Sequence, residues 1–484
     1  MDFNFELHGR RKIYTMANDI TRENVVSVLL DALSIHMLNV SEEEFLYWYR
    51  RGIQPILNRT KEVRPEICNR VVVNNAHLVV TFKNGYFLTK PATYVSRTKD
   101  EAKTEKVQML NEYLYLSGKH DADNQVVDWF HTVGVGALYV EPEEDKNVPA
   151  KAYALDPRSA FCVYSFNPGN PAVFAANVVV DKTNVYIDVF TREKKFHIVG
   201  GYALGTYPIP PLLAIPYEVV SEEPNYLGEI PIIEYEYNTN RMGAFEVAIP
   251  IMDAINNTES NRQDGIEQFV QSLMVLYNCE LEEGVTANTI RSAGMIKLKN
   301  VGDNKADVKI LSEALDQTQT QTTLDDLYEQ MLEKCGVPSS VRDGGSTSDN
   351  VGAVYLRSGW AMADTDARNT EDNFKRANRE FDKVFMKILR EKKILDVNPA
   401  DVDLNFARNS MQNILVKTQS ALNMKELGFA PEIAFERSGL SNDPLTDMEV
   451  SKDYIKAKWP TEAPKPIEDN NNVSEVGETD GEQN

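Results

Sequence analysis

The feature that most constrains this chain is a long segment with a helical pattern in the middle of the sequence. It begins near Ala248, because Pro250 is tolerated only close to a helix start. It continues to about Asn278, which gives a helix of roughly 45 Å at about 1.5 Å per residue. Both ends are apolar, but residues 256–265 are polar on every side. Such a helix usually bridges between parts or lines a wet space and does not lie in a core.

A second helical segment, about residues 315–335, follows and ends at Gly336. The insert between the two helices, residues 280–311, contains two strand-like pieces joined by a turn sequence, Met295–Leu298 and Val308–Leu311. The pattern predicts an antiparallel stalk of two helices with a small β knob at its tip.

The N-terminal part reads as mostly helical over residues 20–120. A capping-box pattern at Ser41, followed by acidic residues, predicts a helix start there. The valine-rich run Asn69–Phe82 fits a strand or a buried helix, and periodicity alone does not decide between them. Residues 102–131 carry apolar side chains at three-to-four spacing and predict a further helix.

Residues 133–237 have a different sequence pattern, in which short β-rich runs are separated by turn sequences. This alternation predicts an antiparallel β-rich module. The predicted strands are Ala137–Val140, Ala152–Leu155, Phe161–Tyr164, Ala176–Val180, Val185–Phe190, Phe196–Ile198 and Ile230–Tyr237.

After the stalk, residues 338–350 form a polar, glycine-containing loop, of a length usually associated with function or disorder. A long helix is predicted over about residues 353–393, and the alternation in Asp401–Ala407 predicts a half-buried strand. Two or three shorter helices are expected over residues 411–455. The tail from Pro460 has no aromatic residue and seven acids against one lysine, so we expect it to be disordered.

Composition limits the possible functions. The chain has 484 residues and a formal net charge of −22. A large negative field repels phosphate, which excludes a protein that grips nucleic acid over most of its surface. Four cysteines, far apart and in no CxxC pair, exclude a zinc ribbon and indicate a reducing compartment. Because no apolar stretch approaches about 20 residues and the N-terminus lacks an apolar signal region, we expect neither a membrane-spanning helix nor a signal peptide.

Enzyme signatures are weak throughout. The sequence GGYALGT at residues 200–206 has the glycine spacing of a phosphate loop but lacks its lysine. The six histidines form no metal-binding pair, and Cys335 has no local histidine partner. The acidic clusters Glu280–Glu283 and Asp401–Asp403 lack a third carboxylate at a matching position and read as solvated faces. We therefore expect no catalytic residue, metal or cofactor.

The C-terminal half of the long helix carries cations around its apolar stripe. They could contact phosphate, or they could pair with the many acids of the chain, and the sequence leaves both interpretations open. These residues are Lys375, Arg376, Arg379, Lys383, Lys387 and Arg390.

Several short segments, each weak alone, follow one another in a specific order over about residues 45–410. They are Tyr47-Trp48-Tyr49-Arg50-Arg51-Gly52, Pro55–Arg59, Asn84–Pro91, Gly136–Tyr139, Leu155-Asp156-Pro157, Gly228–Tyr235, Gly243–Glu246, Met252–Asn256, and Gly352-Ala353-Val354 with Leu356. In this order they resemble the portal proteins of tailed bacteriophages, specifically those of the long-tailed type.

The resemblance implies an α+β subunit of a ring, usually of twelve copies, at one capsid vertex. On that model the parts are a wing (1–245), a stem helix (246–279), a clip (280–311), a second stem helix (312–335), a tunnel loop (336–352), a long wing helix (353–399), a crown (400–459) and an acidic tail (460–484).

The resemblance also implies a non-enzymatic conduit for double-stranded DNA, driven by a separate terminase motor. Major capsid, scaffolding and head–tail connector proteins would be the other partners. The location would be the virion, with host cytoplasm during assembly and no membrane. A metal-dependent nuclease or hydrolase with carboxylate ligands, or another oligomeric connector protein, remains the alternative.

The expected site residues fall into three groups. The DNA-facing tunnel loop comprises Ser339, Ser340, Val341, Arg342, Asp343, Ser346, Thr347, Ser348 and Asp349. The channel-lining stem comprises Asn256, Asn257, Glu259, Asn261 and Gln263. The clip that docks the motor and connector comprises Glu282, Glu283, Lys297, Lys299 and Asp303. A conduit should bind moving duplex weakly, because each neutralised phosphate adds affinity and hence friction.

Overall fold

The computed structural model shows a chain that divides into two units, residues 1–409 and 410–484. The structure describes residues 9–97, 100–201, 212–270, 273–277, 279–281, 298–300, 307–311, 317–339, 359–406, 414–440, 447–448, 450–452 and 454. The mixture of helices and mainly antiparallel sheets confirms the α+β class.

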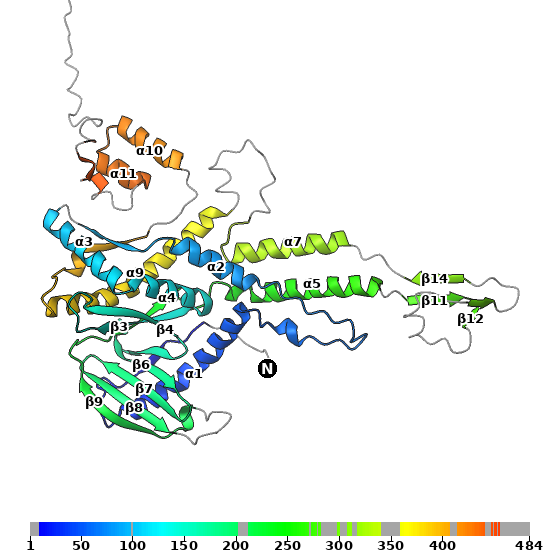
Figure 1. Ribbon diagram of the computed structural model, residues 1–484, viewed down its shortest axis with the longest axis horizontal. Coiled ribbons are helices and arrows are strands. Elements are labelled where there is room, and N and C mark those ends of the chain that lie inside the picture. The colour runs from blue at the N-terminus through cyan, green and yellow to red at the C-terminus, as the bar shows by residue number, and fades with distance from the viewer. Residues whose placement is uncertain are drawn as a thin grey trace, which may run out of the picture. The chain divides into compact units, whose positions relative to one another are not determined.

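Unit 1 contains most of the helices (Figure 1). They are α1 Val25–Arg50, α2 Asn75–Phe87, α3 Glu101–Leu116, α4 Lys119–Val133, α5 Ile249–Val270, α7 Gln317–Lys334 and α9 Trp360–Glu391. Short 3-10 turns are η1 Pro55–Asn58, η2 Leu212–Ala214, η3 Glu246–Ala248 and η4 Pro399–Asp401.

Helix α1 begins at Val25 and continues through Ser41, so the predicted helix start at Ser41 is wrong. Glu42 and Glu43, which suggested a capping box, are instead buried within the helix. Among the described residues, α1 alone is long and apolar enough to cross a membrane by length and composition. Its apolar side chains are used in the protein core, where Leu29 and Leu33 are fully buried.

Two further expectations for the N-terminal part are settled by the structure. The valine-rich run is irregular up to Asn74, and its remainder belongs to helix α2. The single helix expected over 102–131 is two helices, because Gly118 takes a left-handed conformation (φ +75°) between α3 and α4. Glycine adopts this conformation without the steric cost that other residues meet.

All seven strands expected between residues 133 and 237 are present. A six-stranded sheet has the order β1-β5-β6-β7-β8-β9, and a three-stranded sheet has the order β10-β3-β4. All neighbours are antiparallel except the pair β1–β5. The strands are β1 Ile13–Thr15, β3 Val135–Pro142, β4 Ala150–Leu155, β5 Ala160–Ser165, β6 Ala172–Val180, β7 Asn184–Thr191, β8 Lys194–Gly201, β9 Tyr217–Pro224 and β10 Ile232–Glu236. Strands β1 and β9 were not predicted.

Helix α1 connects two hydrophobic cores. Its first half packs on the six-stranded sheet, where Leu29 and Leu33 meet Phe174 and Phe196. Its second half enters a larger core with α2, α4 and the apolar stripe of α9, which includes Phe374, Phe381 and Phe385. Burying a side chain of this kind stabilises the fold by about 1.5–3 kcal/mol.

Helices α5 and α7 lie side by side (Figure 1). Helix α5 ends at Val270, and the backbone of Leu273–Tyr277 is strand β11, so the helix predicted to reach Asn278 is too long. β11 pairs with β14 (Asp307–Leu311), and β12 (Cys279–Leu281) pairs with β13 (Leu298–Asn300). The predicted strand Val308–Leu311 lies within β14, which pairs with β11. Of the predicted strand Met295–Leu298 only Leu298 is described, and it begins β13, which pairs with β12.

The predicted strand near residue 402 is β15 (Val402–Asn405), which pairs with β2 (Thr93–Ser96) inside unit 1. The expected crown began at residue 400, whereas unit 2 begins at residue 410. In unit 2 the described helices are α10 (Ile414–Glu426) and α11 (Pro431–Ser438), which pack against each other.

Candidate functional site

The polar centre of α5 binds a neighbouring stretch of chain that we call the strap, residues 59–73. Three side-chain acceptors of α5 receive hydrogen bonds from alternate backbone N–H groups of the strap. Asn256 Oδ1 accepts from Val73 N at 2.9 Å, Ser260 Oγ from Val71 N at 2.9 Å, and Asp264 Oδ1 from Asn69 N at 2.7 Å. All three helix side chains are buried. The polar middle of this helix thus has a structural partner.

The three hydrogen bonds between α5 and the strap form a ladder. Its spacing follows from the geometry of the two segments. Four residues of α-helix rise about 6 Å, and two residues of extended chain rise about 6.6 Å. Acceptors at every fourth helical position therefore match donors at every second position of an antiparallel segment. The spacing of Asn256, Ser260 and Asp264 was the signal in the sequence that could have revealed the strap.

Charged groups secure the end of the ladder at Asp264. Lys61 Nζ lies 2.9 Å and Arg59 Nη2 lies 3.1 Å from Asp264 Oδ2. Burial opposes ionisation of Asp264, but hydrogen bonds from Asn69 and Lys61 outweigh it and hold the pKa below its ordinary value. The carboxylate is thus ionised where the strap needs an acceptor.

The other end of α5 is joined to the core of unit 1. Tyr49 is fully buried at the end of α1, and its hydroxyl donates to Asp253 Oδ1 at 2.8 Å. Gln54 accepts from Asn256 Nδ2 at 2.5 Å and donates to the carbonyl of Tyr49 at 3.1 Å. These bonds fix the base of α5 against the segment that joins α1 to the strap.

The five residues expected to line a channel lie on different faces of α5. Asn256 is 1% exposed and bonded on both sides, so the expectation that it faces water is wrong. At about 100° per residue, Asn257 and Asn261 share one face of α5, and Glu259 and Gln263 lie nearly opposite. Glu259 is within 3.8 Å of Arg262, which in turn donates to Gln321 of α7.

Most other expected site residues lie outside the described part of the chain. In the tunnel loop only Ser339 is described, and Ser340, Val341, Arg342, Asp343, Ser346, Thr347, Ser348 and Asp349 are not. In the clip, Lys299 belongs to strand β13. The other four expected clip residues lie outside the described residues, namely Glu282, Glu283, Lys297 and Asp303.

A buried charge network joins the first described residues, which include Arg10, to the rest of unit 1. Arg241 binds Glu234 through two hydrogen bonds of 2.7 and 2.8 Å and also donates to Glu236 at 2.8 Å. Arg10, which is 2% exposed, lies 2.8 Å from Glu246 and 3.0 Å from Glu42. Such paired and buried charges were not foreseen from the sequence, because their members are up to 236 residues apart.

Glu43 in this network gives a pH-dependent prediction. Its Oε2 atom is buried and accepts no hydrogen bond from the described residues, and burial raises the pKa of Glu43 to about 8. The folded protein therefore keeps this proton to about pH 8, while the unfolded chain releases it near pH 4.5. Stability should fall with rising pH between these values, by at most about 1.4 kcal/mol per pH unit.

The variant E43Q does not ionise and should lose this part of the pH dependence. We expect urea denaturation at pH 5 and pH 8 to show a smaller loss of stability in E43Q than in the wild type. Glu44, the exposed neighbour, is the matched control, and E44Q should follow the wild type. Equal slopes in all three proteins would contradict the prediction.

Metal and phosphate chemistry find little support in the described residues. Within them, no three His, Cys, Asp or Glu side chains form a group that could hold a metal ion. Arg376 lies 2.7 Å from Glu236, Lys383 lies 2.6 Å from Glu380, and Arg390 lies 2.8 Å from Asp396. For these cations of α9, the geometry favours pairing with acids over phosphate contact.

The family of the chain is decided by comparison with known proteins. A family model described as phage portal protein, SPP1 Gp6-like, matches residues 33–454. The chain belongs to this family of phage portal proteins. Comparison with individual curated proteins finds no match. The resemblance drawn from the ordered sequence segments is thereby confirmed.

Membership establishes the coarse role of this portal subunit. The family is a structural one and not an enzymatic one, and it belongs to the virion capsid. It implies a homo-oligomeric ring at the capsid with capsid and terminase partners.

Proposed function

We propose that this portal subunit assembles into a ring of twelve copies around a channel for double-stranded DNA. A separate terminase motor would package the DNA through this channel, and the DNA would later leave by the same route. The observation that carries the proposal is the family match over residues 33–454, which spans both stem helices and the loop after them. Head–tail connectors would attach after packaging, with the clip as the docking region for motor and connector.

We place the channel wall of the stem on the face of α5 that carries Asn257 and Asn261. Both residues are exposed, and Asn261 Oδ1 also accepts a hydrogen bond from Arg59 at the end of the strap. The adjoining faces are used by the strap and by α7. Amide side chains form a neutral, hydrated wall, and a neutral wall gives duplex DNA no counterion-release affinity. Glu259 lies beside Arg262, which binds α7, and Gln263 lies nearly opposite Asn257 and Asn261 on the helix, so both would contribute less to this wall.

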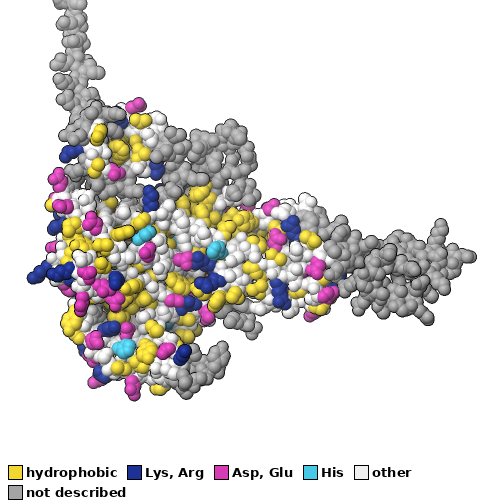
Figure 2. All heavy atoms as spheres, viewed as in Figure 1, with side chains coloured by type: hydrophobic (Ala, Val, Ile, Leu, Met, Phe, Trp, Pro, Cys, Tyr) yellow, Lys and Arg dark blue, Asp and Glu magenta, His cyan; other side chains and the backbone are white. Residues whose placement is uncertain are grey.

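The charge distribution supports a weakly binding conduit. Figure 2 shows cationic and acidic side chains intermixed on the visible face of the described residues. With a net charge of −22, acidic residues outnumber basic ones in the subunit, so its overall field repels phosphate. The loop 336–352, with Arg342 against Asp343 and Asp349, would contact the passing duplex without holding it.

A three-dimensional reconstruction of the purified full-length protein by electron microscopy tests the proposal. We expect closed rings, most of them with twelve-fold symmetry, and a central hole lined by Asn257 and Asn261. Protein that remains monomeric would contradict the proposed function, and rings with these residues directed away from the axis would contradict the channel assignment. Cleavage of plasmid DNA by the same protein with Mg²⁺ would favour the nuclease alternative.

A further inference from the structure

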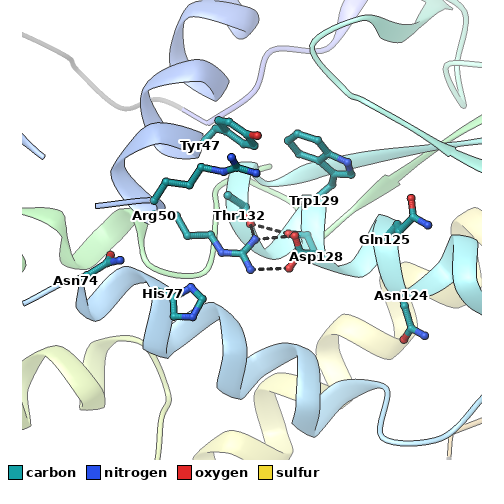
Figure 3. Close-up of a pocket in the computed structure, with 10 residues that line it drawn as sticks. Tyr47, Arg50, Asn74, His77, Asn124, Gln125, Asp128, Trp129 and Thr132 are labelled. Atoms are coloured by element: carbon teal, nitrogen blue, oxygen red, sulfur yellow. Dashed lines mark hydrogen bonds and ion pairs between the residues drawn. The ribbon is translucent and has the colours of Figure 1, made fainter. Parts of the chain in front are cut away.

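A groove of about 840 Å³ lies on unit 1 between helices α1, α2 and α4 (Figure 3). It includes Tyr47, Arg50 and Arg51 of the motif Tyr47–Gly52, whose Tyr49 instead binds Asp253 of the stem helix α5. The lining residues are Tyr47, Arg50, Arg51, Asn74, His77, Asn124, Gln125, Asp128, Trp129 and Thr132.

The groove carries a surplus of positive charge. The charge of Arg50 is paired, because its guanidinium donates two bonds of 2.6 and 2.7 Å to Asp128 and a third to Thr132. Arg51 is exposed, and its guanidinium lies 4.3 Å from the centre of the Tyr47 ring. Among the described residues no carboxylate pairs with Arg51, although the chain as a whole is strongly acidic.

The aromatic wall of the groove is held in a fixed arrangement. The rings of Tyr47 and Trp129 stack with their centres 5.6 Å apart. Arg158 lies over both rings, at 4.3 Å from Tyr47 and 5.3 Å from Trp129, and is itself anchored by Asp156 at 2.6 Å. Ordered Tyr, Trp and Arg side chains are typical of the residues that contribute most to protein interfaces, because little freedom is lost when they bind.

We propose that this groove receives a carboxylate-bearing surface of the adjacent copy of the chain in the ring. The inference rests on the proposed function, since a closed ring joins each subunit to the next through two different faces. Two copies that each carry a charge of −22 repel one another unless the contact sets cations against acids. Arg51, with free donors beside a rigid aromatic wall, is suited to that contact.

Charge reversal at Arg51 tests the proposal. We expect R51E to weaken association of subunits at least tenfold, as measured by analytical ultracentrifugation over a range of protein concentrations. Lys90 is exposed and makes no ion pair among the described residues, so K90E changes the net charge equally and serves as the control. Ring formation by K90E should stay within twofold of the wild type, and thermal unfolding should show that both variants fold.

The results separate the two proposals. Rings of R51E as stable as those of K90E would overturn the assignment of the groove and leave the proposed function intact. A wild-type protein that forms no ring would overturn both. Short duplex DNA that binds monomeric wild type but not R51E would assign the groove to nucleic acid, and so overturn the proposal as well.

A crosslinking experiment identifies the partner surface directly. R51K keeps the charge and supplies an amine that a carbodiimide can join to a carboxylate in contact with it. Rings assembled from equal parts of ¹⁴N- and ¹⁵N-labelled R51K should give mixed-isotope crosslinks at position 51, which arise only between subunits. Crosslinks at position 51 within one subunit alone, or none at all, would contradict the proposal.

Discussion

Replacing Arg241 by methionine should lower the free energy of unfolding of the portal subunit by about 3–5 kcal/mol at pH 8. Arg241 is 4% exposed and is the bidentate partner of Glu234, which lies in the same buried network. The variant leaves the Glu234 carboxylate buried without its counter-charge. Glu236 is less affected, because Lys12 and Arg376 remain at 2.9 and 2.7 Å.

The loss should depend on pH. In the wild type, burial opposes ionisation of Glu234, but Arg241 and Tyr164 outweigh it and hold the pKa below its ordinary value of 4.5. Its stabilising contribution is therefore present above about pH 4.5 and is lost as the pH falls through the lowered pKa. Without Arg241, only Tyr164 and Lys12 still oppose the effect of burial, so the pKa of Glu234 rises and the carboxyl takes up a proton at a higher pH than in the wild type. The difference between R241M and wild type should shrink from pH 8 to pH 5.

Urea denaturation followed by circular dichroism, at one subunit concentration and at both pH values, measures this effect. R376M is the matched control, since Arg376 also binds Glu236 but its side chain is 56% exposed. We expect R376M to cost less than about 1 kcal/mol. The double variant R241M/E234Q should recover much of the loss, because it removes the unpaired charge. Equal effects of R241M and R376M would contradict a buried role for the network.

The regular elements of this fold could be predicted from the sequence where local pattern and burial agree. The alternation in residues 133–237 indicated the strands of both sheets, and the stripe of Phe374, Phe381 and Phe385 indicated α9. Strand β9 was missed because it lies at an edge of the sheet and carries polar residues such as Glu222 and Glu223, which break the apolar alternation. The helix start at Ser41 was misplaced because a local capping pattern does not show that Glu42 meets Arg10.

The sequence predicted the family and the order of the segments that form the candidate site. It did not predict which residues contact one another there. Ordered segments identified the portal family, and the helix pair around a β insert was found from composition and periodicity alone. The strap was missed because its residues, such as Val71 and Val73, use backbone N–H groups, which carry no side-chain signal. The polar middle of α5 was therefore interpreted as facing water, although part of it binds the strap. Long-range backbone partners of this kind are set by tertiary structure.

The adjacent residues Asn256 and Asn257 allow a test of the strap against the channel wall. N256A should lower the free energy of unfolding by about 2–4 kcal/mol, because it leaves the N–H of Val73 without its acceptor and Oε1 of Gln54 without its donor. N257A removes the same atoms from an exposed position of the same helix. It should change stability by less than about 1 kcal/mol, in the stabilising direction, since alanine favours helix more than asparagine.

Hydrogen exchange read by mass spectrometry shows where the change occurs. In N256A, peptides covering residues 69–73 should exchange faster than in wild type, because the ladder of N–H groups to α5 has lost its first acceptor. The same peptides in N257A should exchange at the wild-type rate. Equal stability and equal exchange in the two variants would show that the strap does not hold the stem. A loss confined to N256A means that one face of α5 anchors the stem to the subunit, while Asn257 stays available for the channel wall that we propose.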